Sequence, residues 1–131
     1  MYAALANPQQ RYKQQGILTA NPAELVVMLY DGCIKQLKIA NLAIGEKNFN
    51  RSDMALRKAV AILMELVNSL SLEYSIAREL LELYEFVINE IALILLEEEA
   101  GRIPGVLTIM EELRDAWRTV AKETQGTAEL V

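Results

Sequence analysis

Apolar residues along this chain recur at the three-and-four spacing of an amphipathic helix in four separate segments. The first segment begins with Asn21-Pro22-Ala23-Glu24. Asn21 is a good N-cap residue, Pro22 suits the first helical position, and Glu24 can reach back to the cap as in a capping box. The pattern predicts helices over residues 22–47, 51–70, 75–99 and 104–123.

Each predicted helix carries an apolar stripe suited to burial in a common core. The four stripes consist, in chain order, of Leu25, Met28 or Leu29, Cys33, Leu37, Ala40 and Ile44; of Leu56, Ala59, Val60, Leu63, Leu66, Val67 and Leu70; of Ile76, Leu80, Leu81, Leu83, Tyr84, Val87, Ile88, Ile91, Ala92 and Leu95; and of Val106, Met110, Leu113, Trp117 and Val120. Further apolar residues of the first helix lie off its stripe: Val26, Val27, Tyr30, Ile34 and Leu42. The first and third helices are therefore more apolar than one core requires.

The ends of the helices are marked by turn and capping residues. Asn50 is a candidate cap for the second helix, Gly101 stands where a C′ residue is expected after the third, and Pro104 can open the fourth. Helices of about 20 to 26 residues are about 30 to 40 Å long, and short links place successive helices side by side in opposite directions. The sequence thus predicts a single all-α domain over residues 1–131, an antiparallel four-helix bundle.

The first 20 residues differ from the rest because they are polar and rich in Gln, with Pro8 and Gly16 among them. They predict a mobile N-terminal arm before the first helix. Tyr12, Ile17 and Leu18 give this arm apolar side chains, which leaves two interpretations open. The arm is either a frayed terminus or a segment that docks on the bundle, and a docked arm can act as a lid over a binding groove or as a clamp on its occupant.

Composition excludes several kinds of chemistry. Apolar residues make up 53% of the chain and charged residues 24%, which is typical of a globular protein. There is no His, and Cys33 is the single Cys, so Cys/His zinc sites and His-based catalytic triads cannot be built. The adjacent acidic residues of the third and fourth helices point to different sides of a helix and cannot form a carboxylate pair. We therefore predict no enzyme activity, no cofactor and no metal site, with Cys33 a small core residue.

Targeting signals are not evident either. The N-terminal residues lack an apolar signal-peptide core, and the densest apolar run, Ile91 to Leu96, is far too short to span a membrane. A cytoplasmic protein without a membrane span is the default prediction. The net charge of −5 also argues against nucleic-acid binding, which depends on Lys and Arg.

The charge is divided unevenly between the two halves of the chain. Residues 1–60 carry 8 basic and 4 acidic side chains, a balance of +4, whereas residues 61–131 carry 5 basic and 14 acidic side chains, a balance of −9. Two halves of opposite sign attract each other within one fold. The surplus of apolar helical surface is a separate feature. It is typical of a partner-binding site and favours a binding module that recognises amphipathic segments.

Three blocks of the sequence carry distinctive motifs. The first runs from Tyr12 through Ile17-Leu18-Thr19-Ala20-Asn21-Pro22 to Tyr30-Asp31-Gly32. The second is Leu80-Leu81-Glu82-Leu83-Tyr84-Glu85-Phe86, and the third is Leu113-Arg114-Asp115-Ala116-Trp117. Together the three blocks resemble the FliS family of flagellar secretion chaperones, over roughly residues 12 to 122. Asn21 stands where Ser is common in the family, the link around residues 71–74 is shorter than in many relatives, and the arm before Tyr12 has no clear counterpart.

The resemblance implies a cytoplasmic helical-bundle chaperone that binds the disordered C-terminal segment of flagellin, prevents premature polymerisation and assists flagellar export. It adds the export gate and an anti-sigma factor as further candidate partners. The alternative is a helical-bundle adaptor or regulatory scaffold that binds another amphipathic partner. The residues expected to contact the partner are Tyr12, Ile17, Leu18, Leu25, Met28, Leu29, Tyr30, Ile34, Tyr84, Val87, Ile91, Leu113 and Trp117.

Overall fold

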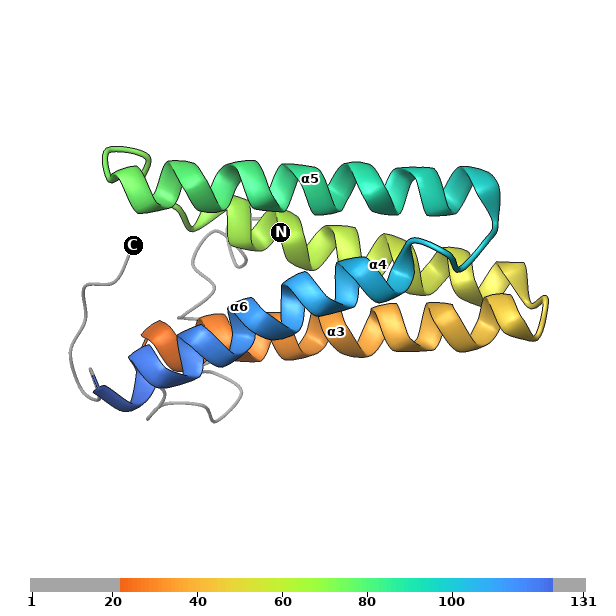
Figure 1. The fold of residues 1–131 in the computed structure, drawn as a ribbon, viewed down its shortest axis with the longest axis horizontal. Coiled ribbons are helices and arrows are strands. Elements are labelled where there is room, and N and C mark those ends of the chain that lie inside the picture. Colours follow the sequence, from red (N-terminus) through yellow and green to blue (C-terminus); the bar gives the residue numbers. More distant parts are fainter. Residues whose placement is uncertain (1–21, 124–131) are drawn as a thin grey trace, which may run out of the picture.

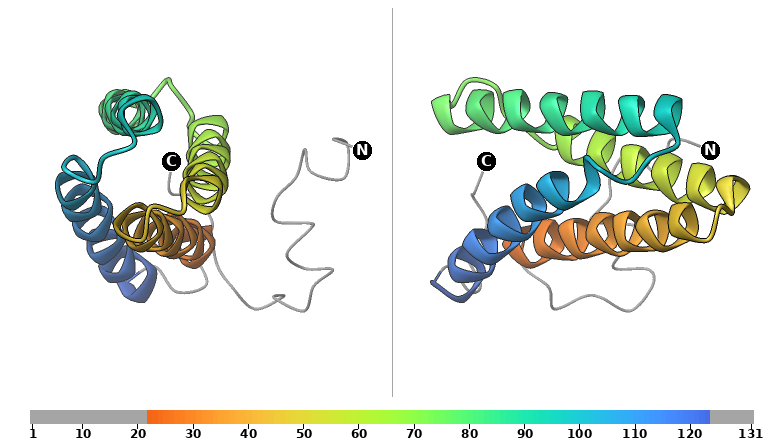
Figure 2. Two further views of the ribbon diagram at one scale, coloured as in Figure 1. Left: turned by 90° about the vertical axis from the view of Figure 1, so that its right-hand side faces the viewer. Right: turned by 45° about the vertical axis from the view of Figure 1, so that its right-hand side comes forward.

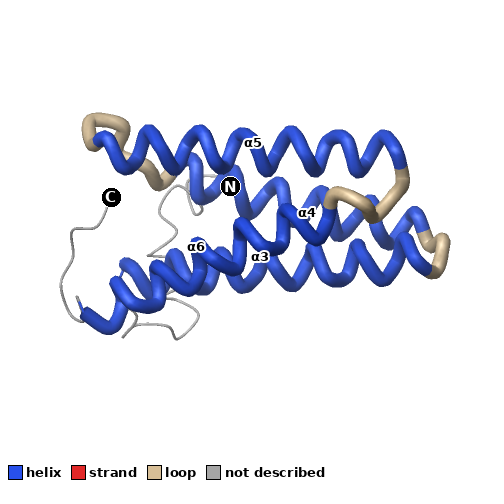
Figure 3. Tube along the Cα trace, viewed as in Figure 1, coloured by secondary structure: helices blue, strands red, loops and turns tan. Residues whose placement is uncertain are grey.

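The computed structural model describes residues 22–123, which form four α-helices and, within that range, no β-strand (Figure 3). The helices are α3 (Pro22–Gly45), α4 (Phe49–Asn68), α5 (Ser75–Glu97) and α6 (Ile103–Glu123). Short links join them, so that each helix runs back along the one before it (Figure 1). The predicted all-α antiparallel four-helix bundle is confirmed for this part of the chain.

The observed helix ends lie within two residues of the predicted ends, but two of the predicted caps are wrong. Asn48, rather than Asn50, caps α4, because its side-chain Oδ1 accepts a hydrogen bond from the backbone N–H of Arg51 at 3.2 Å. Glu98, rather than Gly101, ends α5 in a left-handed conformation (φ 55°), where its N–H donates to the carbonyl of Ile94. Left-handed residues other than Gly are uncommon, so the sequence pattern favoured the glycine. The predicted cap Asn21 lies outside the described residues.

Seen end on, the helices form a ring in the order α3, α4, α5, α6 (Figure 2). Helix α3 packs extensively against both α4 and α6, whereas α5 packs mainly against α4. Gly32 lies at the close approach of α3 to α4: a Cβ atom added there would come within 3.3 Å of Ile62 Cδ1. From its start beside the end of α5, α6 runs obliquely away from α5 and across α3 (Figure 1, Figure 2).

This packing decides which apolar residues are buried. Since α3 has two close neighbours, its buried arc is wide and includes Tyr30 and Ile34, which the sequence pattern had placed off the core stripe. Since α5 has one close neighbour, its buried arc is narrow, and Ile76 and Leu83 are exposed rather than in the core stripe as predicted. Cys33 is fully buried, as expected of a small core residue.

Candidate partner-binding surface

Two tyrosines meet at the centre of the bundle. Tyr30 of α3 and Tyr84 of α5 are both buried, their hydroxyl oxygens are hydrogen-bonded at 2.5 Å, and their ring centroids are 6.3 Å apart. Burial raises the pKa of Tyr84 to about 12, an effect that the hydrogen bond from Tyr30 partly offsets. Burial also raises the pKa of Tyr30, an effect that the neighbouring Tyr84 reinforces and the Trp117 side chain opposes. Both hydroxyls therefore stay neutral at physiological pH and tie α3 to α5 across the ring.

The residues expected to contact a partner fall into three groups. Seven are buried in the core: Leu25, Tyr30, Ile34, Tyr84, Val87, Ile91 and Trp117. Leu29 and Leu113 are half-buried, and Met28 is exposed. Tyr12, Ile17 and Leu18 lie outside the described residues. These seven side chains offer little surface to a partner in this structure, so for them a binding role stays a prediction.

Sequence reasoning did not identify which apolar residues of α5 are exposed. Ile76, Leu83 and Phe86 have 51%, 36% and 49% of their surface exposed and are spaced seven and three residues apart, so they share one face of the helix. We call these three residues the α5 strip. The signal was present in the sequence: Leu80, Tyr84, Val87, Ile91 and Ile94 already complete a core stripe at three-and-four spacing, which leaves the strip on a neighbouring face.

The α5 strip lies on the side of α5 that faces α6. Glu90 follows Phe86 by four residues and Leu83 by seven, so its side chain is on the same face. Arg102, in the link to α6, donates hydrogen bonds to Glu90 and Glu97 and thus marks that face as the α6 side. The strip lies on the N-terminal side of these Arg102 contacts and continues toward the start of α5, where α6 has diverged (Figure 1).

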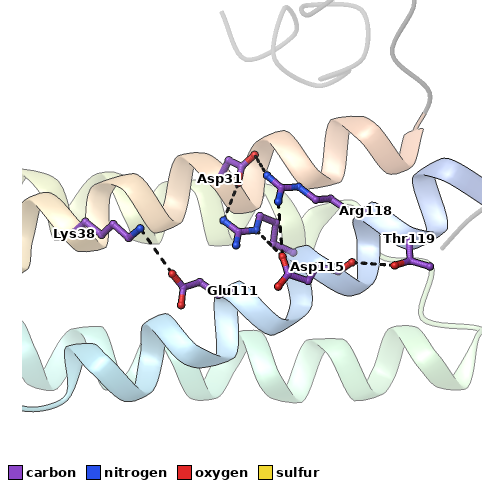
Figure 4. A network of polar contacts seen from close by, with 7 residues as sticks. Asp31, Lys38, Glu111, Asp115, Arg118 and Thr119 are labelled. Carbon is purple, nitrogen blue, oxygen red and sulfur yellow. Dashed lines mark hydrogen bonds and ion pairs between the residues drawn. The ribbon is translucent and has the colours of Figure 1, made fainter.

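On α6, the two flanks of the buried stripe differ in character. Arg114 and Arg118 pair with Asp31 of α3 at 3.3 and 3.7 Å, and Glu111 pairs with Lys38 of α3 at 3.8 Å, as Figure 4 shows for the labelled residues. Leu113 lies on the other flank, toward α5, and is half-buried, as is Ile109 one turn earlier. The α5 strip and this apolar flank of α6 border the same side of the bundle.

The surroundings of the α5 strip are acidic. Helix α5 contains five Glu residues, at positions 79, 82, 85, 90 and 97, and one basic residue, Arg78. No cluster of acidic or Cys side chains in residues 22–123 is arranged to hold a metal ion. No helix in the same range is long and apolar enough to cross a membrane. The arrangement can offer a partner an apolar helical face bordered by carboxylates.

The described fold and surface define the class of the protein: an all-α four-helix bundle with an exposed apolar face beside a diverging helix. Comparison with known sequences narrows the class. Residues 5–124 match the family described as Flagellar protein FliS. Because this match extends over most of the chain, the protein belongs to the FliS family.

Individual members of the family align with this chain over most of their length. The flagellar secretion chaperone FliS of Bacillus subtilis is 30% identical over 115 residues, 88% of this chain and 86% of that protein. The flagellar secretion chaperone FliS of Escherichia coli is 29% identical over 125 residues, 90% of each chain. A crystal structure of a flagellar chaperone from bacteria has the same fold, with a TM-score of 0.74 at 23% identity over 87% of this chain and 94% of that chain.

Proposed function

We propose that this protein binds the C-terminal segment of flagellin in the cytoplasm, prevents its premature polymerisation and presents it for flagellar export. Membership of the FliS family supports this proposal, since the relatives are named flagellar secretion chaperones. The observation that supports the α5 strip as the flagellin-binding surface is the exposure of its three large apolar side chains beside a diverging α6. On this proposal the protein is a binding protein and not an enzyme.

The dimensions of the α5 strip suit a short helix. Ile76 and Phe86 are ten residues apart, which is about 15 Å along a helix axis. A partner helix of about three turns, with apolar residues three and four apart, can cover this length. A disordered flagellin segment would become helical as it buries these side chains, and the ordering cost would be offset by apolar burial. We expect binding with a negative heat-capacity change and a gain in helix signal.

The test compares lysine substitutions on one helix. Leu83→Lys and Phe86→Lys place a charge in the α5 strip, whereas Leu96→Lys places the same charge on the same helix at a residue that is 79% exposed and outside the strip. We expect the first two changes to weaken binding of a flagellin C-terminal peptide by at least about tenfold, because the charge would be buried on binding. Leu96→Lys should leave the affinity within about twofold.

Isothermal titration calorimetry on the three variants gives the affinities, and thermal melts confirm that each variant is folded. Equal affinities for all three variants would show that the α5 strip is not the flagellin site. A soluble complex on co-expression with full-length flagellin, lost for Leu83→Lys and Phe86→Lys but kept for Leu96→Lys, would support the proposal in the context of the whole client.

A further inference from the structure

A second surface lies on the other flank of α6, away from the α5 strip. Here α3 and α6 border an open hollow of about 420 Å³. Its lining combines three apolar side chains with three cations and one carboxylate: Ile34, Ile39, Leu42, Lys35, Lys38, Arg114 and Asp31. Ile34 is buried, Ile39 is half-buried and Leu42 is 60% exposed, so the apolar floor rises toward solvent along α3. We call this surface the α3–α6 hollow.

The cations around the α3–α6 hollow retain capacity for a further anion. Lys35 is exposed and makes no ion pair with any residue in the range 22–123. Lys38 has a single, long ion pair, 3.8 Å from Glu111. Arg114 is held in place by Asp115 at its Nε and by Asp31 at one terminal nitrogen, while its second terminal nitrogen, Nη2, has no hydrogen bond within the described region.

The charge of the α3–α6 hollow selects the kind of occupant. Its lining carries three cations against one carboxylate, although the whole chain has a net charge of −5 and α5 has five acidic side chains against one basic. An occupant with carboxylates flanking apolar side chains matches both parts of the lining. Residues 1–21 of this chain do not match, because they contain Arg11 and Lys13 and no acidic side chain.

We propose that the α3–α6 hollow docks an acidic amphipathic helix of a second protein partner. Its apolar residues would pack on Ile34, Ile39 and Leu42, and its carboxylates would pair with Lys35 and Lys38. Because the hollow and the α5 strip lie on opposite flanks of α6, this partner and the client of the α5 strip can be bound at the same time. The protein would then act as a connector between two helical segments of different charge.

The test uses a synthetic peptide of about 18 residues as the probe, long enough for about five helical turns. Its Leu residues recur at three-and-four spacing and Glu residues flank them; a second peptide has the same Leu residues with Lys in place of every Glu. Fluorescence anisotropy with the full chain should show that the acidic peptide binds and the basic peptide does not. Raising the NaCl concentration from about 50 to about 300 mM should weaken binding, because surface charge pairs are screened.

Variants of the protein locate the site. Lys35→Glu combined with Lys38→Glu should weaken binding of the acidic peptide by at least about tenfold, as expected when attraction becomes repulsion. Lys58→Glu, a single charge reversal at an exposed position of α4, is the control for a charge change away from the hollow and should change the affinity by less than about twofold. Leu83→Lys in the α5 strip should leave the acidic peptide bound, which separates this proposal from the proposed flagellin site.

Four results would overturn the proposal: no binding of the acidic peptide at about 1 mM, a concentration at which even a weak complex forms; equal binding of both peptides; equal loss of binding in Lys58→Glu; or competition by a single-stranded RNA as effective as the acidic peptide itself. Analytical ultracentrifugation covers one more occupant. Self-association that Lys35→Glu with Lys38→Glu abolishes would assign the hollow to a second copy of this chain instead.

Discussion

Helix α6 is tied to α3 by ion pairs, whereas no ion pair or side-chain hydrogen bond within residues 22–123 joins α6 to α5. Toward α3, Asp31 receives two Arg side chains of α6, and Lys38 pairs with Glu111. Toward α5, the polar side-chain contacts found within residues 22–123 are those of Arg102, in the link between the helices, with Glu90 and Glu97. Beyond these contacts the apolar α5 strip remains exposed.

The difference between the two flanks shows how one bundle can be both stable and open. On the α3 flank, buried side chains and peripheral ion pairs act together, and they fix the direction in which α6 crosses α3. On the α5 flank, apolar surface is left without a partner helix in the described part of the chain. Exposed apolar surface of this kind is typical of binding sites, so the weakly packed flank is the one suited to a client.

The largest expected effect on stability is at Trp117 of α6, which is 9% exposed and interacts with Tyr30 of α3. Trp117→Ala should lower the free energy of unfolding by about 3 to 5 kcal/mol, because a large buried aromatic side chain is lost and a cavity is left. Urea denaturation measures the change, and Leu96→Ala, at a 79% exposed position, is the control expected within about 0.5 kcal/mol of the original. If Trp117→Ala leaves stability unchanged but abolishes flagellin binding, then Trp117 is a contact residue rather than a support of the α3 flank.

The second prediction concerns alkaline pH. Burial raises the pKa of Cys33 from 9.0 to about 12 and that of Tyr84 from 10.0 to about 12, so both groups hold their protons more tightly in the folded state. The contribution of each group to the free energy of unfolding is fully present below pH 9 for Cys33 and below pH 10 for Tyr84. This contribution is lost as the pH rises toward 12. For Tyr84, this contribution to the free energy of unfolding is at most about 3 kcal/mol.

Urea melts at several pH values from neutral to strongly alkaline test this loss. Tyr84→Phe removes one titrating group and should flatten the decline above pH 10. A decline of the same steepness in Tyr84→Phe would mean that Tyr84 does not control alkaline unfolding.

Much of this fold could be predicted from the sequence because the three-and-four spacing of apolar residues is local information. Four helices and their directions follow from such spacing and from short links. The helix caps were less predictable. Asn48 and Asn50 are both good N-cap residues, and α4 begins after Asn48 because the left-handed turn at Lys47 comes directly before it. Glu98 likewise ends α5 although Gly101 is the better left-handed residue.

The candidate surface was predicted less well, for a tertiary reason. Ile34 and Leu83 have the same apolar character, yet Ile34 is buried because two helices flank α3, and Leu83 is exposed because α6 leaves α5. The width of a helix's buried arc depends on how many helices pack against it. The apolar pattern within one helix does not show that number. Sequence reasoning therefore found that α3 and α5 have surplus apolar residues but did not identify which of them face solvent.

A third prediction tests the tie between α3 and α5 across the ring. Tyr30→Phe leaves the Tyr84 hydroxyl buried without its partner, and Tyr84→Phe does the same for Tyr30, so each change should cost about 1 to 3 kcal/mol. The double variant removes both hydroxyls and should cost less than the sum of the single changes. A double-mutant cycle in urea measures this coupling. Strict additivity would mean that the hydrogen bond does not link the two helices energetically.

The smallest expected effect on stability comes from removing one negative charge on each side of α6. Asp31→Asn removes the negative charge that Arg114 and Arg118 share, but Asp31 is 44% exposed, so the loss should be about 1 kcal/mol or less. This loss should shrink further as salt screens the charges. Glu82→Gln makes the same change on exposed α5, where other Glu residues lie nearby, and should leave stability unchanged or slightly raised. Thermal melts of both variants at low and high salt make the comparison. An equal effect of both substitutions, or a loss at Asp31 that salt does not reduce, would show that the ion pairs of the α3 flank do not hold α6 and that core packing alone sets its direction.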